Sequence, residues 1–200
     1  METGERRTAT ERTWMFPPVT GWTFDQVKDL EVPFDWELVD GVVVVRGETA
    51  LWHNHVRGAL VSVLRAAETG PYAAVSGQCV MVDEHNVVKP DLIVCDPRGL
   101  DVFEVECAPV EKVALAVEVV SPTSRQADRV RKPALFSANK VPYYWRVELD
   151  RDQKLAVHEY WLNADTLTYF PAPSHPVHQH KLITELPFPV EIDLDSLVGF

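Results

Sequence analysis

The feature that most constrains the fold is an apolar run, VALAVEVV at residues 113–120, which contains a single acid, Glu118. A run that is apolar nearly throughout is typical of a central strand covered on both faces. An ionised glutamate in such a strand is costly unless it is paired with a cation or bound to a metal. The sequence therefore predicts a buried strand whose one acid has a function.

A second acid, Asp91, stands inside another strand-like run, VVKPDLIVC at residues 87–95. Two carboxylates aimed at one point raise each other's pKa, so a site that keeps both ionised implies a cation. Ligands that are all oxygen select Mg²⁺ or Mn²⁺ over zinc. We expect Asp91 and Glu118 to share such an ion if their strands lie close in one sheet.

The distribution of charge bears on the partner. A net charge of -11 argues against a generic nucleic-acid binder, because steering toward phosphate favours a basic surface. Residues 121–132 nevertheless carry three arginines and Lys132 against one acid, Asp128. A basic patch beside an acidic metal site suits a metal-dependent phosphodiesterase, whereas the alternative interpretation is a solvated helix face.

Composition predicts an ordered chain outside the membrane. Hydrophobic residues make up 46% of the 200 residues, and no apolar run approaches the roughly 20 residues needed to span a bilayer. We expect a disordered leader at 1–19, a single domain at 20–200 and a cytoplasmic location, because the leader has no apolar signal region. The cysteines, Cys79, Cys95 and Cys107, lack Cys-x-x-Cys spacing and are expected to be reduced and buried.

The order of elements predicts an α+β fold, a mixed β-sheet flanked by helices with a C-terminal antiparallel meander. Pro133 is expected to kink or break its helix and to bias Lys132 away from helical dihedrals. The expected elements are a helix at 24–31, a hairpin at 36–45 turning at Asp40-Gly41, a helix at 51–68, a second hairpin at 72–95, a strand at 113–120, a helical segment at 121–139 and a meander from 142 onward.

Several blocks together resemble a known family. They are WELVDG at 36–41, PDLIV at 90–94, EVVSPTS at 118–124, Asp128, Lys132 and VPYYWRVE at 141–148. In this order they are similar to the Uma-two family of restriction-endonuclease-like proteins, within the PD-(D/E)xK nuclease superfamily. The resemblance covers roughly residues 20–195.

The resemblance implies a restriction-endonuclease-like core that hydrolyses phosphodiester bonds in nucleic acid, DNA above all, with Mg²⁺ or Mn²⁺. It implies Asp91, Glu118 and Lys132 as catalytic residues, and it adds Glu37 to Asp91 and Glu118 as a metal ligand. The sequence departs from the superfamily pattern at Val120, where a lysine two residues after the glutamate is expected. The resemblance implies that Lys132, on the following helix, takes that place.

Alternatives remain for both the site and the protein. Lys132 could instead be an exposed lysine paired with Asp128 at i,i+4 spacing. Val120 and the acidic balance also suit a catalytically silent nucleic-acid-binding or regulatory module, and the meander suits a protein-interaction subunit. Of the two histidines that begin the helix at 51–68, His53 and His55, only His55 is expected on its apolar side.

Large apolar side chains in the C-terminal strands lead us to expect a homodimer, since such patches mark partner surfaces. The residues concerned are Tyr143, Tyr144, Trp145, Tyr160, Trp161 and Phe170.

Overall fold

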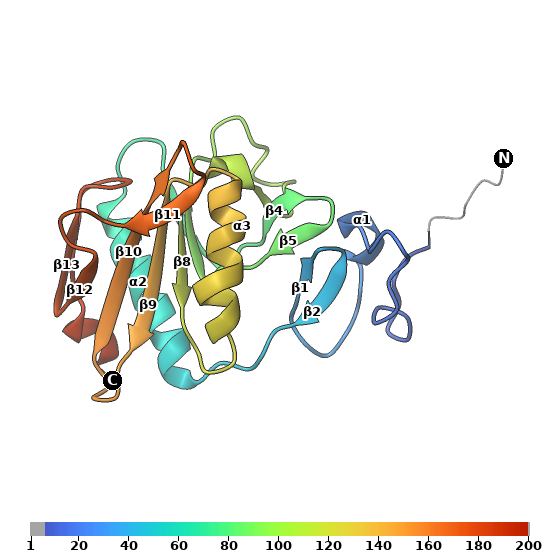
Figure 1. Ribbon diagram of the computed structural model, residues 1–200, viewed down its shortest axis with the longest axis horizontal. Helices are drawn as coiled ribbons and strands as arrows, with labels where there is room; N and C mark the ends of the chain where they lie inside the picture. Colours follow the sequence, from blue (N-terminus) through green and yellow to red (C-terminus); the bar gives the residue numbers. More distant parts are fainter. Residues whose placement is uncertain (1–6, 200) are drawn as a thin grey trace.

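A mixed β-sheet forms the centre of the computed structural model, which describes residues 7–199 (Figure 1). Six of its seven strands follow the order β11-β10-β9-β8-β6-β3, and β12 pairs with β10. Strands β8 and β9 are parallel, whereas the other pairs are antiparallel. The strands are β3 (Ala73–Ser76), β6 (Leu92–Cys95), β8 (Val113–Val119), β9 (Tyr143–Leu149), β10 (Leu155–Asn163), β11 (Thr168–Pro171) and β12 (Val177–Gln179).

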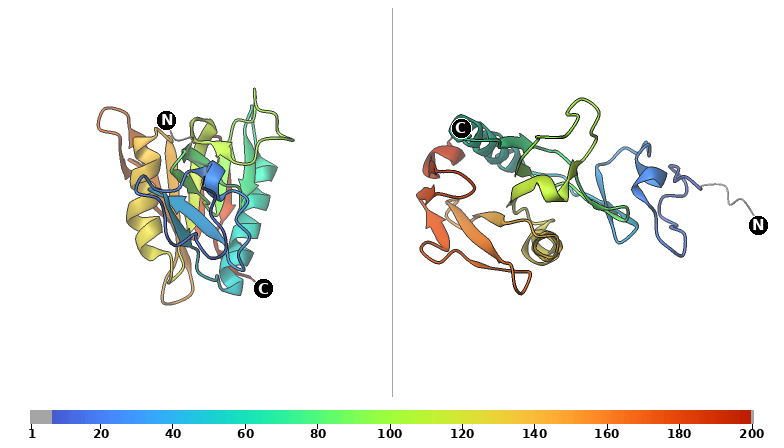
Figure 2. Two further views of the ribbon diagram at one scale, coloured as in Figure 1. Left: turned by 90° about the vertical axis from the view of Figure 1, so that its right-hand side faces the viewer. Right: turned by 90° about the horizontal axis from the view of Figure 1, so that it is seen from above.

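Two helices cover opposite faces of this sheet (Figure 2). Helix α2 (Leu51–Ala67) packs an apolar stripe that includes Leu60 on one face, and helix α3 (Lys132–Ala138) packs Phe136 on the other. All seven residues of β8 are buried between them. The predicted central strand is therefore confirmed, together with the α+β arrangement.

A second, five-stranded sheet has the order β2-β1-β5-β4-β7. The predicted hairpin turn has positive φ at both Asp40 (49°) and Gly41 (71°), values that suit a tight two-residue connection. The sheet consists of β1 (Trp36–Val39), β2 (Val42–Val45), β4 (Val80–Asp83), β5 (Asn86–Val88) and β7 (Ala108–Pro109). Helix α1 (Phe24–Val27) precedes β1 in the chain, and a 3-10 turn, η1 (Val110–Lys112), follows β7.

The predicted second hairpin divides between the two sheets. Strands β4 and β5 pair in the smaller sheet, while β3 and β6 pair in the central one. The chain changes sheet at Gly77, which has a φ of 69°, and again at Pro90, which has no N–H to offer a ladder. Asp91 therefore lies where the smaller sheet meets the central sheet.

The C-terminal strands form the predicted antiparallel meander from β9 to β11. A two-stranded sheet, β13 (Lys181–Thr184) and β14 (Val190–Asp193), and a final 3-10 turn, η3 (Asp195–Val198), complete the face covered by α2. Of the aromatic residues expected at a dimer surface, Tyr144 and Trp145 are fully buried, whereas Phe170 is exposed. The homodimer stays a prediction, and fewer exposed apolar side chains support it than the sequence suggested.

The prediction of three reduced cysteines is wrong, because Cys79 and Cys107 form a disulfide and only Cys95 is a free, buried thiol. The pairing joins the segment before β4 to the segment before β7, and these two strands are neighbours in the smaller sheet. Strand register, invisible in cysteine spacing, brings the two sulfurs together.

The predicted disordered leader falls partly outside the described residues, which begin at Arg7. Between residues 7 and 19 the chain forms turns that contact the rest of the protein: Ala9 N–H donates to Gln26 O, and Trp22 Nε1 donates to Trp14 O. None of the described helices is both long and apolar enough to cross a membrane.

Candidate active site

The two predicted acids lie on neighbouring strands and line the same cavity, of about 120 Å³. Strands β6 and β8 pair with Leu92 opposite Val117, so Asp91, one residue before β6, comes opposite Glu118. Residues directly opposite each other on antiparallel strands project to the same face of the sheet. The main-chain N–H of Val119 also donates to Asp91 Oδ2 at 2.8 Å, which fixes the aspartate against β8.

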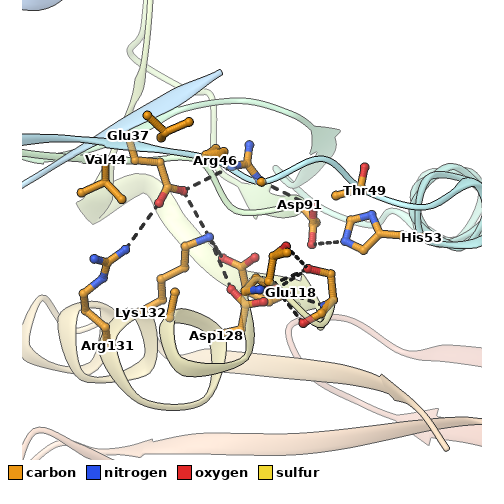
Figure 3. A pocket seen from close by; sticks show the side chains of 16 residues that line it. Glu37, Val44, Arg46, Thr49, His53, Asp91, Glu118, Asp128, Arg131 and Lys132 are labelled. Carbon is orange, nitrogen blue, oxygen red and sulfur yellow. Dashed lines mark hydrogen bonds and ion pairs between the residues drawn. The ribbon is translucent and has the colours of Figure 1, made fainter. Parts of the chain in front are cut away.

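Lys132 enters the cavity from the helix on the same face, as the resemblance implied (Figure 3). Its Nζ lies 2.8 Å from Glu118 Oε1, 3.2 Å from Glu37 Oε1 and 3.6 Å from Asp128 Oδ1. The i,i+4 pair with Asp128 thus exists, but Lys132 is 3% exposed, so the interpretation as a surface lysine is wrong.

Lys132 keeps helical dihedrals, φ -63° and ψ -45°, although it precedes Pro133. The preceding turn, η2 (Ala127–Arg131), is a π-helix, in which the N–H of Lys132 bonds to Ala127 O five residues back. The carbonyl of Asp128, which lacks its usual helical donor, accepts a hydrogen bond of 2.6 Å from the Tyr144 hydroxyl. The predicted break at Pro133 is therefore a π turn, which directs Asp128 and Lys132 into the cavity.

Glu37 is buried in the cavity from strand β1 of the smaller sheet. One carboxylate oxygen accepts the main-chain N–H of Lys89 at 2.8 Å, and the other lies 3.8 Å from Arg131. The structure therefore places the third predicted acid beside Lys132, between the two sheets.

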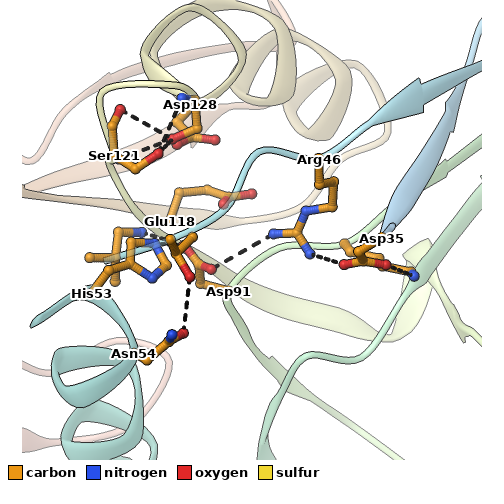
Figure 4. Close-up of polar contacts among 12 residues, drawn as sticks. Asp35, Arg46, His53, Asn54, Asp91, Glu118, Ser121 and Asp128 are labelled. Atoms are coloured by element: carbon orange, nitrogen blue, oxygen red, sulfur yellow. Dashed lines mark hydrogen bonds and ion pairs between the residues drawn. The ribbon is translucent and has the colours of Figure 1, made fainter. Parts of the chain in front are cut away.

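Arg46 and His53 are site residues that the sequence did not reveal (Figure 4). Arg46 follows β2 and lies 3.9 Å from Asp91 Oδ1 and 3.8 Å from Glu37 Oε1. His53 Nε2 lies 3.2 Å from Asp91 Oδ2. The expectation that only His55 faces the apolar side of α2 is wrong: His53 is buried, three residues before the buried Val56, and that helical spacing was the available signal.

The pKa values of the two predicted acids shift in opposite directions. Burial raises the pKa of Asp91, but the His53 hydrogen bond and charge, the Val119 N–H and Lys132 outweigh it and lower the pKa. Complete burial raises the pKa of Glu118 well above its usual range despite Lys132, and the neighbouring carboxylates add to the rise. Burial lowers the pKa of Lys132, but Glu118, Glu37 and Asp128 raise it further, so the amine is held as an ammonium.

The cavity has more acidic than basic groups. Its lining holds Glu37, Asp91, Glu118 and Asp128 against Arg46, Arg131 and Lys132. Burial raises the pKa of Asp128 as well, and Lys132 only partly offsets that rise. A further cation would relieve the repulsion among these carboxylates.

The carboxylate oxygens of the cavity fit Mg²⁺ or Mn²⁺, which take only some of their ligands from the protein, better than a metal whose ligands all come from the protein. Asp91 Oδ1 is buried and accepts no hydrogen bond from the described residues. Within residues 7–199 no three His, Cys, Asp or Glu side chains are grouped closely enough to hold an ion. Mg²⁺ is commonly bound by one or two carboxylates, with water and substrate phosphate completing its ligands.

A mixed sheet with helices on both faces, and with acids from adjacent strands meeting a lysine, defines a restriction-endonuclease-like protein. Residues 24–195 match the Uma2 family model, described as "Putative restriction endonuclease", and the chain therefore belongs to this family. A search of curated proteins gives no match.

The fold is similar to a solved structure described as "a putative nuclease belonging to DUF820" from Anabaena variabilis. The two chains are 16% identical with a TM-score of 0.66, and the similarity covers 88% of this chain and 99% of the other. At this identity the similarity supports the fold.

Proposed function

We propose that this protein is a nuclease that hydrolyses phosphodiester bonds in DNA with Mg²⁺ or Mn²⁺. The observation that carries the proposal is the meeting of Asp91 and Glu118, from paired strands, with the ammonium of Lys132 in one cavity. Acids that hold a cation, beside fixed positive groups for phosphate, are the parts that this chemistry needs.

Asp91 and Glu118 would hold the ion, with Glu37 assisting through a water ligand, because no three such side chains within residues 7–199 are grouped closely enough to bind it directly. When bound, Mg²⁺ supplies Lewis-acid polarisation of a phosphate oxygen and a lowered pKa for a water ligand. Asp91 is the acid best prepared for this role, since its lowered pKa keeps it ionised and its Oδ1 accepts no hydrogen bond from the described residues.

Lys132 and Arg46 would stabilise negative charge on the phosphate. Lys132 is held as an ammonium at the centre of the cavity by three carboxylates, and Arg46 lies between Glu37 and Asp91. Fixed cations of this kind act most strongly in a cavity that excludes water, where charges are poorly screened.

A catalytically silent module that binds nucleic acid is the second candidate. The observation that favours it is the ion pairing of Lys132 with Glu118, Glu37 and Asp128, since a lysine engaged by three carboxylates neutralises the site without any metal. Val120 at the superfamily's lysine position points the same way.

Cleavage assays separate the two candidates. Purified protein should nick DNA with Mg²⁺ or Mn²⁺, and this cleavage should stop when a chelator is added. Glu118→Ala should lower the rate by orders of magnitude, whereas Lys132→Ala should cost about 10² to 10³, the range found for single charge-stabilising groups.

Glu111→Ala, which replaces an exposed acid just before β8, is the matched control and should cleave like the wild type. Cleavage that persists in folded Glu118→Ala would contradict the proposed site. Metal-independent binding without cleavage of any DNA or RNA would favour the silent module.

We also propose a homodimer and a cytoplasmic location. Exposed apolar side chains on the C-terminal strands support the dimer, and they are Phe170, Val177 and Ile183. Light scattering should give twice the monomer mass of 22.6 kDa, and a monomer mass at micromolar concentration would contradict it. Cell fractionation tests the location, and the disulfide makes that test necessary, since disulfides are uncommon in the cytosol.

A further inference from the structure

A second cavity, of about 380 Å³, lies between α3 and the meander strands β9 to β11. Four of its lining residues come from the helical segment that supplies Lys132 to the first cavity, and none of its lining residues lines the first. The lining consists of Arg129, Pro133, Ala134, Ser137, Arg146, Tyr160, Leu167, Thr168 and Tyr169.

Positive charge dominates this second cavity. Arg129 and Arg146 share one carboxylate, Glu148, through contacts of 2.6 to 3.0 Å. Arg146 contacts Glu148 through Nε at 2.6 Å, whereas no hydrogen bond joins its two terminal nitrogens to the described residues, and its side chain is only 17% exposed. One guanidinium is therefore available for an anion in a largely desolvated position.

The pKa of His158, which pairs across the sheet with Arg146, responds to the positive charge of this cavity. Burial, followed by the charge of Arg146, lowers the pKa of His158, and Arg129 adds to the effect while Glu148 opposes it. The single carboxylate therefore does not cancel the field of the two arginines at this position.

Aromatic rings form the other part of the lining. The Arg146 guanidinium lies over the Tyr160 ring at 5.4 Å, which holds both groups in place. Tyr169 is fixed by a hydrogen bond from its hydroxyl to Val141 O and by stacking on the buried Tyr144. A charged guanidinium beside fixed tyrosine rings suits a ligand that carries an anion next to a flat ring.

The two cavities lie on different sides of one helical segment. Arg129 lines the second, whereas Arg131 and Lys132 line the first. An α-helix with its side chains is about 10–12 Å across, so a flexible polynucleotide can contact both sides.

We propose that the second cavity binds one nucleotide of the polynucleotide whose phosphate enters the first, with Arg146 and Arg129 on a phosphate and a base stacked on Tyr160. This inference rests on the proposed function for its substrate class. It adds a nucleotide subsite away from the carboxylates, so the carboxylate site alone does not determine how tightly the strand is held.

Binding measured without cleavage tests the subsite. The probe is a fluorescein-labelled single-stranded DNA of about twelve nucleotides, a length within the range that single-strand-binding domains cover. Its binding is measured by fluorescence anisotropy in excess chelator. Arg146→Gln should weaken binding about tenfold or more, as expected for a lost charge-assisted contact. Arg151→Gln, an exposed arginine outside both cavities, is the matched control for charge and should bind like the wild type.

Salt dependence separates phosphate contact from stacking. Arg146→Gln should reduce the slope of log K against log salt by about 0.7, the value for one phosphate on a single strand. Tyr160→Leu should weaken binding about tenfold with an unchanged slope, because stacking does not release counterions. Tyr160→Phe keeps the ring and should bind like the wild type, which also shows that the fold tolerates change at this position.

The outcomes distinguish this proposal from the proposed nuclease activity. Loss of binding in Arg146→Gln and Tyr160→Leu, without any cleavage by the wild type, would leave the subsite in place in a silent module. Binding by Arg146→Gln equal to that of Arg151→Gln would overturn the subsite, even if the wild type cleaves DNA. Equal weakening by Tyr160→Leu and Tyr160→Phe would overturn the stacking role.

Discussion

Lys132 Nζ lies 2.8 Å from Glu118 Oε1, so an ammonium from a helix contacts the only acid of a strand that is buried at every position. The same nitrogen lies near Glu37 and Asp128, and no other lysine or arginine in the described residues is within 4 Å of Glu118. Lys132 therefore holds together acids from three elements that would otherwise repel one another.

Lys132→Met should destabilise the protein by about 3–5 kcal/mol, the cost of removing one partner from a buried ion pair. The Glu118→Gln/Lys132→Met double variant should cost less than the sum of its single changes, because the two residues interact directly. Urea unfolding measures both. Lys154→Met, an exposed lysine, is the control, and a loss below about 1 kcal/mol in Lys132→Met would contradict the assigned role.

Tyr144→Phe should loosen the π turn, because the Asp128 carbonyl then loses the hydroxyl that donates to it. An unpaired buried carbonyl costs about 1–3 kcal/mol. We also expect a fall in kcat with little change in KM, since Lys132 shifts while the outer contacts remain. Tyr143→Phe, which removes a hydroxyl on the same strand outside both cavities, is the control, and a kcat equal to that of this control would argue against positioning by Tyr144.

The sequence predicted those parts of the site whose signal is local. An acid in an apolar strand is visible in one dimension, so Asp91 and Glu118 were found and register then proved to place them together. Arg46 follows a hairpin strand and from the sequence alone is expected to be a surface charge, because its contact with Asp91 arises only where the smaller sheet meets the central one. His53 was missed through an error in helical phase.

The same limit explains the remaining differences. The disulfide depends on the pairing of β4 with β7, two strands separated in the chain by β5, β6 and the loop at 96–107, and no spacing rule predicts that pairing. Pro133 predicted the position of the helix irregularity correctly. Whether the chain breaks there or adopts a π turn depends on Tyr144, which comes from a later strand.

Cys79→Ser should destabilise the protein by about 3 kcal/mol, because a cross-link that closes a loop of this length restricts the unfolded chain. Thiol titration in denaturant should find one free thiol per chain, that of Cys95. Three free thiols would contradict the disulfide. Cys107→Ser should match Cys79→Ser, and the double variant should cost no more than either change alone.

His53→Ala should make the protein more sensitive to acid. Burial then raises the pKa of Asp91 with less opposition, since the largest lowering contribution comes from His53. A lowered pKa contributes stability that is present above the unfolded value of 3.8 and is lost as the pH falls through the folded value. The midpoint of acid unfolding should therefore move to higher pH in His53→Ala, whereas Ser62→Ala, which replaces an exposed and uncharged side chain of the same helix, should unfold like the wild type. An unmoved midpoint in His53→Ala would contradict the pairing.

Metal affinity should rise with pH because Glu118 must lose a proton before it can bind an ion. Its pKa is raised well above the ordinary 4.5, so the carboxyl is protonated over a pH range in which Asp91 is already ionised. Above the ordinary value of 4.5, Mn²⁺ affinity should rise by up to tenfold per pH unit until the pH passes the raised pKa of Glu118, and binding should release protons. Titration calorimetry in buffers of different ionisation enthalpy measures both without relying on activity. Glu118→Gln should bind more weakly and with less pH dependence, whereas Glu111→Gln should follow the wild type. A wild-type affinity that stays constant across this range would show that Glu118 does not hold the ion.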